Sequence, residues 1–177
     1  ASITVLPFLK IMDDIILVII KRTITDEKLQ VRKMSLKTLR FVNKNQDALS
    51  IAIERINDRM PIIRQDAALL ITDMLQSMDI FHQWLDSVLP LVMDTDNKTQ
   101  QLAMKLIEEE FFNHPERYPL CQPSDFDVLR TALPIFKAKN VNLKGFAKVL
   151  MEADPTEDST WCLISVVMAI EKDLFKA

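Results

Sequence analysis

Glycine is almost absent from this chain, since Gly145 is the only one in 177 residues. Tight β-hairpins, Gly-rich phosphate loops and dinucleotide-binding turns need glycine for positive φ angles or for close backbone approach. Its scarcity argues against those motifs and favours an all-α chain whose short corners are marked by Pro and Asp. Long apolar runs are also missing. The longest, residues 15–20, is far short of the roughly 20 residues that cross a bilayer, so we expect no membrane contact.

Residues that usually carry chemistry are few and scattered. Cys121 and Cys162 have no metal-binding or disulfide spacing, and low cysteine use fits a reducing compartment such as cytosol or nucleus. His82 and His114 have no further ligand at a spacing that zinc sites use. The serines fall in predicted helices or caps, and none lies in a nucleophile elbow. We therefore expect no cofactor, no metal and no enzymatic activity.

One spacing recurs three times, and it is the strongest signal in the sequence. An Asp is followed six residues later by Arg or Gln, and the second residue comes at the start of a helical apolar pattern. The pairs are Asp26 with Arg32, Asp58 with Arg64, and Asp94 with Gln100. Their second members are 32 and 36 residues apart. Self-similarity at a period of this length is typical of an α-solenoid built from helical hairpins.

The repeat divides the chain into helix pairs. Three repeats are predicted at residues 3–44, 46–78 and 80–113, followed by a Pro-rich loop at 114–124 and a degenerate helical region at 125–177. Their helices are expected at 3–22, 27–44, 46–56, 60–78, 80–93, 97–113, 125–137, 140–152 and 158–175, with Ser124 and then Asp158 or Ser159 as later caps. The first helix is apolar on most sides, which predicts a piece of a longer solenoid.

The repeated residues have a structural interpretation. An Asp just before a helix accepts bonds from free backbone N–H groups and favours the positive end of the helix dipole. An Arg six residues later can reach an Asp of its own or of the neighbouring repeat. We therefore predict a ladder between repeats, formed by Asp26, Arg32, Asp58, Arg64, Asp94 and Gln100, in which the Gln keeps a hydrogen bond but loses the charge.

Charge is unevenly distributed along the chain. Residues 21–64 hold eleven Lys or Arg against five Asp or Glu, whereas residues 65–110 hold two against nine. Lys33, Lys37, Arg40 and Lys44 are spaced to share one helix face, with Arg55 and Arg59 just beyond. Such a face can follow the phosphate backbone of double-stranded DNA without reading its sequence. The alternatives are a solvated face, or pairing with the acidic neighbouring repeat.

The repeats resemble a known family. The Asp–Arg spacing, the apolar residue before the Arg, and the small residue three after it (Ser35, Ala67 and Ala103) are similar to HEAT repeats, which form armadillo-like superhelices. Residues 84–112, WLDSVLPLVMDTDNKTQQLAMKLIEEEFF, resemble the D-type non-SMC subunit of condensin II, including Gln100 in place of an Arg. The segments LQVRKMSLKTL (29–39) and STWCLISVVMAI (159–170) are similar too. Segments 113–125 and 138–157 match no part of that family.

The resemblance implies a role for the chain. It implies a scaffold in mitotic chromosome condensation, located on chromosomes in the nucleus and bound to kleisin and SMC subunits. The alternative is a HEAT regulatory or transport adaptor, such as a phosphatase scaffold or karyopherin-like carrier, that binds only proteins. Separately, the residues predict that Trp84 and Trp161 pack in the core and that Glu108, Glu109 and Glu110 form a solvated acidic surface.

Overall fold

The computed structural model describes residues 13–41, 46–75, 79–114, 117, 121–152 and 156–171. Within these ranges the chain forms nine α-helices and no strand, so the all-α fold class is confirmed. The helices belong to two compact units, residues 1–80 and 81–177. The division comes at the start of the third predicted hairpin, and each unit is described by itself.

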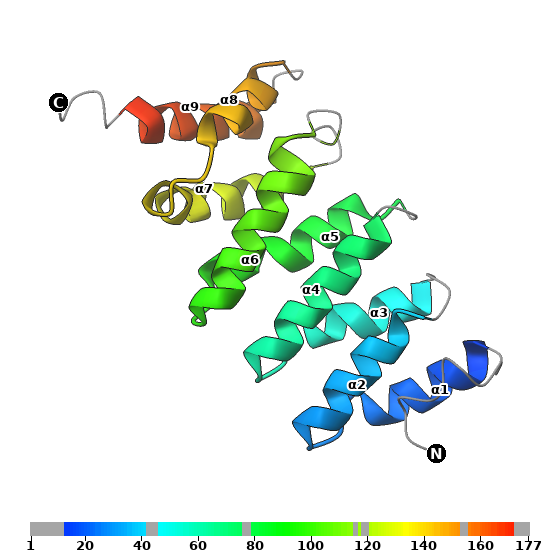
Figure 1. The fold of residues 1–177 in the computed structure, drawn as a ribbon. Helices are drawn as coiled ribbons and strands as arrows, with labels where there is room; N and C mark the ends of the chain where they lie inside the picture. Colours follow the sequence, from blue (N-terminus) through cyan, green and yellow to red (C-terminus); the bar gives the residue numbers. More distant parts are fainter. Residues whose placement is uncertain are drawn as a thin grey trace. The chain divides into compact units, whose positions relative to one another are not determined.

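The first unit consists of two stacked helical hairpins (Figure 1). Its helices are α1 (Asp13–Thr23), α2 (Leu29–Leu39), α3 (Gln46–Arg55) and α4 (Pro61–Leu75). Helix α1 packs on α2 and α3 on α4, while α1 also contacts α3 and α2 contacts α4. The first helices of the two hairpins therefore lie side by side, and so do their second helices. The core between them includes Leu36, Leu39, Leu49, Ile63 and Ile71, which are all fully buried or nearly so.

The second unit contains one interrupted hairpin and three further helices. It consists of α5 (Phe81–Val88), the 3-10 helix η2 (Leu89–Met93), α6 (Asn97–Ile107), the π-helix η3 (Glu108–Phe112), α7 (Pro123–Ala138), α8 (Leu143–Glu152) and α9 (Glu157–Glu171). Helix α7 contacts η2, α8 contacts η3, and α9 packs on both α7 and α8. The last two described helices, α8 and α9, therefore pack against the earlier elements of this unit (Figure 1).

Two predicted helices of the second unit are broken for identifiable reasons. The helix predicted at 80–93 changes to a 3-10 helix beside Pro90, which has no N–H to donate to the preceding turn. The helix predicted at 97–113 ends in a π-helical turn, and its wider geometry buries both Phe111 and Phe112 although they are consecutive. These rings pack with Phe146, whose centroid lies 5.5 Å and 4.6 Å from theirs.

The predicted caps of the later helices are wrong in detail. Helix α7 begins at Pro123 rather than after Ser124, because the buried carboxylate of Asp125 accepts the N–H of Gln122 at 2.7 Å. Helix α9 begins one residue earlier than predicted. Thr156 and Ser159 cap it reciprocally: each side-chain oxygen accepts the other's backbone N–H, at 3.1 and 2.8 Å. Here Ser159 has the third position of a capping box rather than the cap itself.

Some predicted features lie outside the described residues. They include residues 3–12 of the first helix, the ends that were expected at 42–44 and 76–78, much of the Pro-rich loop, and 172–175 of the last helix. Among the described helices, α2 is shorter than predicted, because its last helical residue is Leu39 and a turn follows at residues 40 and 41.

Candidate functional site

The three repeated aspartates make the same local contact. Each carboxylate accepts a hydrogen bond from the backbone N–H two residues later, which closes an Asx turn before the next helix. The contacts are Asp26 with Lys28 at 2.8 Å, Asp58 with Met60 at 2.9 Å and Asp94 with Asp96 at 2.7 Å. The recurring Asp is therefore a corner residue that fixes how the chain enters its second helix.

Arg32 connects the two hairpins of the first unit. Its Nε and Nη2 donate to the two carboxylate oxygens of Asp58 at 2.9 and 3.1 Å, and both side chains are only 4% exposed. Its Nη1 donates to the carbonyls of Asp26 and Glu27 at 2.8 and 3.0 Å. A two-oxygen pairing of this kind fixes geometry as well as energy. The register between hairpins is therefore set by a buried, fully hydrogen-bonded ion pair.

Arg64 repeats part of this arrangement one hairpin later. Its Nη1 donates to the carbonyl of Asp58 at 2.8 Å, as Arg32 does to Asp26. Asp94 and half-buried Gln100 are in the second unit, where Asp94 precedes α6 and Gln100 lies in its first turn. The cap of that helix is Asp96, which sequence reasoning did not single out: it accepts from the backbone N–H and hydroxyl of Thr99 at 2.9 and 2.8 Å.

Two of the predicted DNA-contacting arginines also make contacts within the corner. Arg55 is 17% exposed, and its Nη1 lies 3.6 Å from the Asp58 carboxylate. Arg59 is exposed and donates from Nη2 to the Glu27 carbonyl at 3.0 Å. Both side chains therefore help to hold the corner. Sequence spacing placed them near the basic face but could not show these bonds, which depend on how the hairpins stack.

Three of the remaining predicted cations form no such contacts, and the fourth, Lys44, lies outside the described residues. On α2, Lys33 is half-buried and Lys37 is exposed, and the exposed Arg40 directly follows the last residue of that helix. Within the described part of the chain, the side chains of these three form no hydrogen bond or ion pair. From Lys33 to Arg40 there are seven helical steps, or about 10 Å along a helix axis. We call Lys33, Lys37 and Arg40 the α2 basic face.

The structure places one histidine beside a carboxylate. His82 Nδ1 is 3.3 Å from Asp125 Oδ2, and Asp125 is buried while the His82 side chain is 44% exposed.

In the ranges that the structure describes, no group of three His, Cys, Asp or Glu residues is arranged to hold a metal ion. None of the helices in those ranges combines the length and apolar character of a bilayer-spanning segment.

The two tryptophans differ sharply in environment. Trp84 is completely buried, as predicted, and its ring centroid lies 5.7 Å from that of Phe81. The prediction for Trp161 is wrong, because its side chain is 54% exposed. It forms an apolar stripe on α9 with Ile164 and Met168, which are 41% and 56% exposed. Apolar spacing alone identifies a helix face, but not whether another element covers it.

This difference gives a fluorescence prediction. We expect acrylamide to quench Trp161 readily and Trp84 hardly at all, because only the exposed indole meets the quencher. Trp161→Phe should therefore leave a blue-shifted, poorly quenched emission, and Trp84→Phe should leave a red-shifted, strongly quenched one. Equal quenching of the two single-tryptophan variants would contradict the exposure described for α9.

Both thiols have raised pKa values. Burial raises the pKa of Cys162 to about 12. Burial also raises the pKa of Cys121, with smaller contributions from Asp125 and Cys162. Because the thiolate is the reacting form, we expect both to react with a disulfide reagent near neutral pH more than about tenfold slower than in denaturant.

The same shift has a consequence at high pH. The folded pKa of Cys162 is raised above the ordinary value of 9.0. Its contribution to stability is therefore complete below that value and is lost as the pH rises toward about 12. Cys162→Ala should reduce the alkaline loss of stability. Native-state labelling as fast as in denaturant would contradict the burial of Cys162 and the partial burial of Cys121.

Comparisons with protein-family models, with curated proteins and with solved structures give no match for this chain.

Proposed function

We propose that this chain is a segment of a non-catalytic HEAT-type scaffold, an α-solenoid that belongs to a condensin II-type complex and contacts the DNA backbone. The observation that carries the repeat interpretation is the corner geometry. The Asx turn recurs at Asp26, Asp58 and Asp94, and the bidentate Arg32–Asp58 pair links consecutive hairpins. The sequence resemblance supports the choice of complex, with kleisin and SMC subunits as partners on nuclear chromosomes.

The α2 basic face supports the DNA contact. Lys37 and Arg40 are exposed, and neither forms an ion pair with a described acidic residue. No ion pair with a described residue therefore has to break before these side chains bind a phosphate. A face about 10 Å long can accompany roughly three phosphates of one strand, at about 3.4 Å of helix axis each. Such contact is independent of base sequence and releases bound counterions.

The test is a salt titration of DNA binding. Fluorescence anisotropy of a labelled duplex of about 30 base pairs should show binding at low ionic strength that weakens steeply as salt rises. Two duplexes of unrelated sequence should bind equally. No binding at low ionic strength would remove the DNA role, and a strong preference for one sequence would contradict contact through the backbone alone.

The α9 apolar stripe favours a second candidate function. A protein-only adaptor, of the phosphatase-scaffold or karyopherin-like kind, needs an apolar surface and no DNA affinity. Trp161, Ile164 and Met168 provide such a surface at i, i+3 and i+7 spacing, which a partner helix can cover. This alternative is favoured if the DNA titration fails while Trp161→Ala weakens the capture of a purified kleisin, karyopherin cargo or phosphatase subunit.

A further inference from the structure

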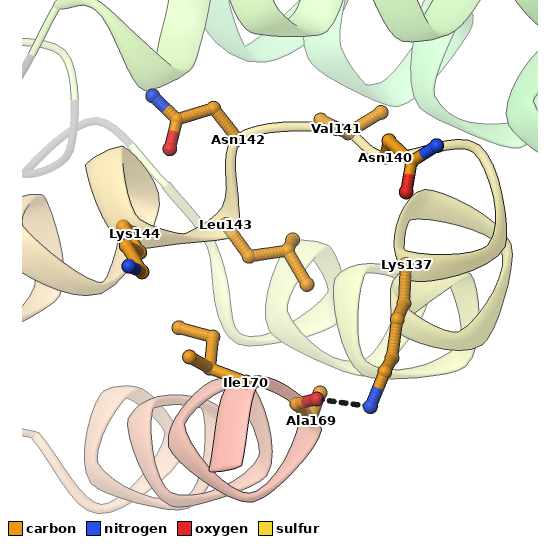
Figure 2. Close-up of a pocket in the computed structure, with 8 residues that line it drawn as sticks. All are labelled: Lys137, Asn140, Val141, Asn142, Leu143, Lys144, Ala169 and Ile170. Atoms are coloured by element: carbon orange, nitrogen blue, oxygen red, sulfur yellow. Dashed lines mark hydrogen bonds between the residues drawn. The ribbon is translucent and has the colours of Figure 1, made fainter. Parts of the chain in front are cut away.

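A pocket of about 450 Å³ lies in the second unit, where the α7–α8 loop meets the end of α9 (Figure 2). Its middle is aliphatic, with Leu143 and Ile170 facing one another and Val141 above them. Lys137 and Lys144 flank this middle from opposite sides. Among the described residues that line the pocket there is no carboxylate, so its charged groups are both positive.

The loop that forms one wall has a defined shape. Helix α7 ends at Ala138, and two residues later Asn140 has a φ of 58°, the left-handed conformation that stops a helix. The N–H of Val141 then donates to the carbonyl of Phe136 at 2.9 Å, which closes the turn. At the start of α8, the side-chain oxygen of Asn142 accepts the N–H of Gly145 at 3.3 Å. The wall is therefore held by its own hydrogen bonds.

The polar groups differ in what they can offer. The ammonium of Lys137, on α7, donates to the carbonyl of Ala169 near the end of α9 (Figure 2). This bond connects the α7 side of the pocket to its aliphatic floor, formed by Leu143 and Ile170. Lys144 is exposed and forms no ion pair within the described part of the chain. The oxygen of Asn142 caps α8, and its amide nitrogen points away from Leu143 and Ile170 (Figure 2). The exposed Lys144 ammonium is therefore the available cation beside the aliphatic floor of the pocket.

We propose that this pocket binds the carboxy-terminal residue of a peptide partner when that residue is aliphatic. The carboxylate pairs with the Lys144 ammonium, and the side chain packs on Leu143 and Ile170. Capture of a terminal carboxylate is a recurring mode of peptide recognition. A phosphate diester fits less well, because it has no aliphatic body for the floor. This site does not depend on the DNA contact of α2.

The test uses the full chain and a fluorescein-labelled pentapeptide that ends in Leu-Leu with a free carboxylate. We expect saturable binding, weakened about tenfold when the same peptide ends in an amide, since a charge-assisted contact of about 1.4 kcal/mol is lost. Lys144→Gln should weaken the free acid by a similar factor and should hardly affect the amide. That selective loss is a readout that a merely structural role would not produce.

Two further variants sharpen the test. Asn142→Asp keeps an oxygen for the Gly145 N–H but places a negative charge at the pocket, so it should weaken the free acid while α8 stays capped. Lys148→Gln is the matched control, because Lys148 is one turn along the same helix, exposed, paired with Glu152 at 3.7 Å and outside the pocket.

Four results would overturn the proposal. The first is no saturable binding of the free acid at millimolar peptide, and the second is equal affinity for acid and amide. The third is an equal loss in Lys148→Gln and Lys144→Gln. The fourth is competition by inorganic phosphate as strong as that by unlabelled peptide. It would show that the pocket is a general anion site and would contradict the proposed contact with an aliphatic side chain.

Discussion

Asp58→Ala is expected to destabilise the first unit by about 3–5 kcal/mol, which is the usual cost of leaving one member of a buried ion pair without its partner. The substitution removes the carboxylate that accepts both Nε and Nη2 of Arg32, and that guanidinium is only 4% exposed. It also removes the acceptor for the Met60 N–H and an ion-pair partner of Arg55. Contacts to three residues are lost at one corner.

The measurement is amide hydrogen exchange in α2 and α4, because it reports the opening of this unit separately from the second. Asp47→Ala is the matched control. Its partner Lys21 is 3.7 Å away and the two side chains are 52% and 66% exposed, so the change should stay within about 0.5 kcal/mol. Equal effects of the two substitutions would show that the Arg32–Asp58 pair does not hold the hairpins together.

Reversing the charge of the α2 basic face is expected to have the largest effect on DNA binding. In the double variant Lys37→Glu, Arg40→Glu, two cations that neutralise phosphates become anions that repel them. The slope of log affinity against log salt should fall by about 2, one unit for each lost phosphate contact. Both side chains are exposed and form no bond with described residues, so circular dichroism and thermal unfolding should stay close to those of the original chain.

The control for this variant changes the same net charge elsewhere. Lys98→Glu with Lys105→Glu alters two exposed lysines of α6 in the second unit. If the α2 basic face is the contact, the control should retain most of the salt slope. A control that loses as much as the α2 variant would mean that bulk charge, rather than this helix face, governs association.

The helices could be predicted because their signals are local. Apolar periodicity together with Asp and Pro at the corners places α3, α4 and α6 close to where they are observed. The predicted start of α7 is wrong because Ser124 is a residue type that often caps helices. The buried carboxylate that accepts the backbone hydrogen bond at this turn instead belongs to Asp125. Which of the two residues makes the capping contact depends on burial, and burial is determined by the tertiary fold.

The candidate sites were less predictable, since they depend on stacking. The spacing of Asp26, Arg32 and Asp58 indicated residues within reach of one another, and the structure brings these three together. Nothing in the spacing of Arg59 indicated its bond to the Glu27 carbonyl, 32 residues earlier. The exposure of Trp161 was also hidden, because an apolar stripe looks the same in the sequence whether or not it is covered.

Cross-linking from the α2 basic face tests its place beside DNA most directly. Lys37→Cys would be labelled with a benzophenone maleimide and irradiated with duplexes of unrelated sequence. The native thiols, of which Cys162 is buried and Cys121 half-buried, should react slowly because their pKa values are raised. Lys105→Cys would be labelled in parallel. The account predicts cross-links from position 37 to either duplex that disappear at high salt, and few from position 105. Equal cross-linking from both positions, or none from position 37 under conditions where the duplex binds, would contradict it.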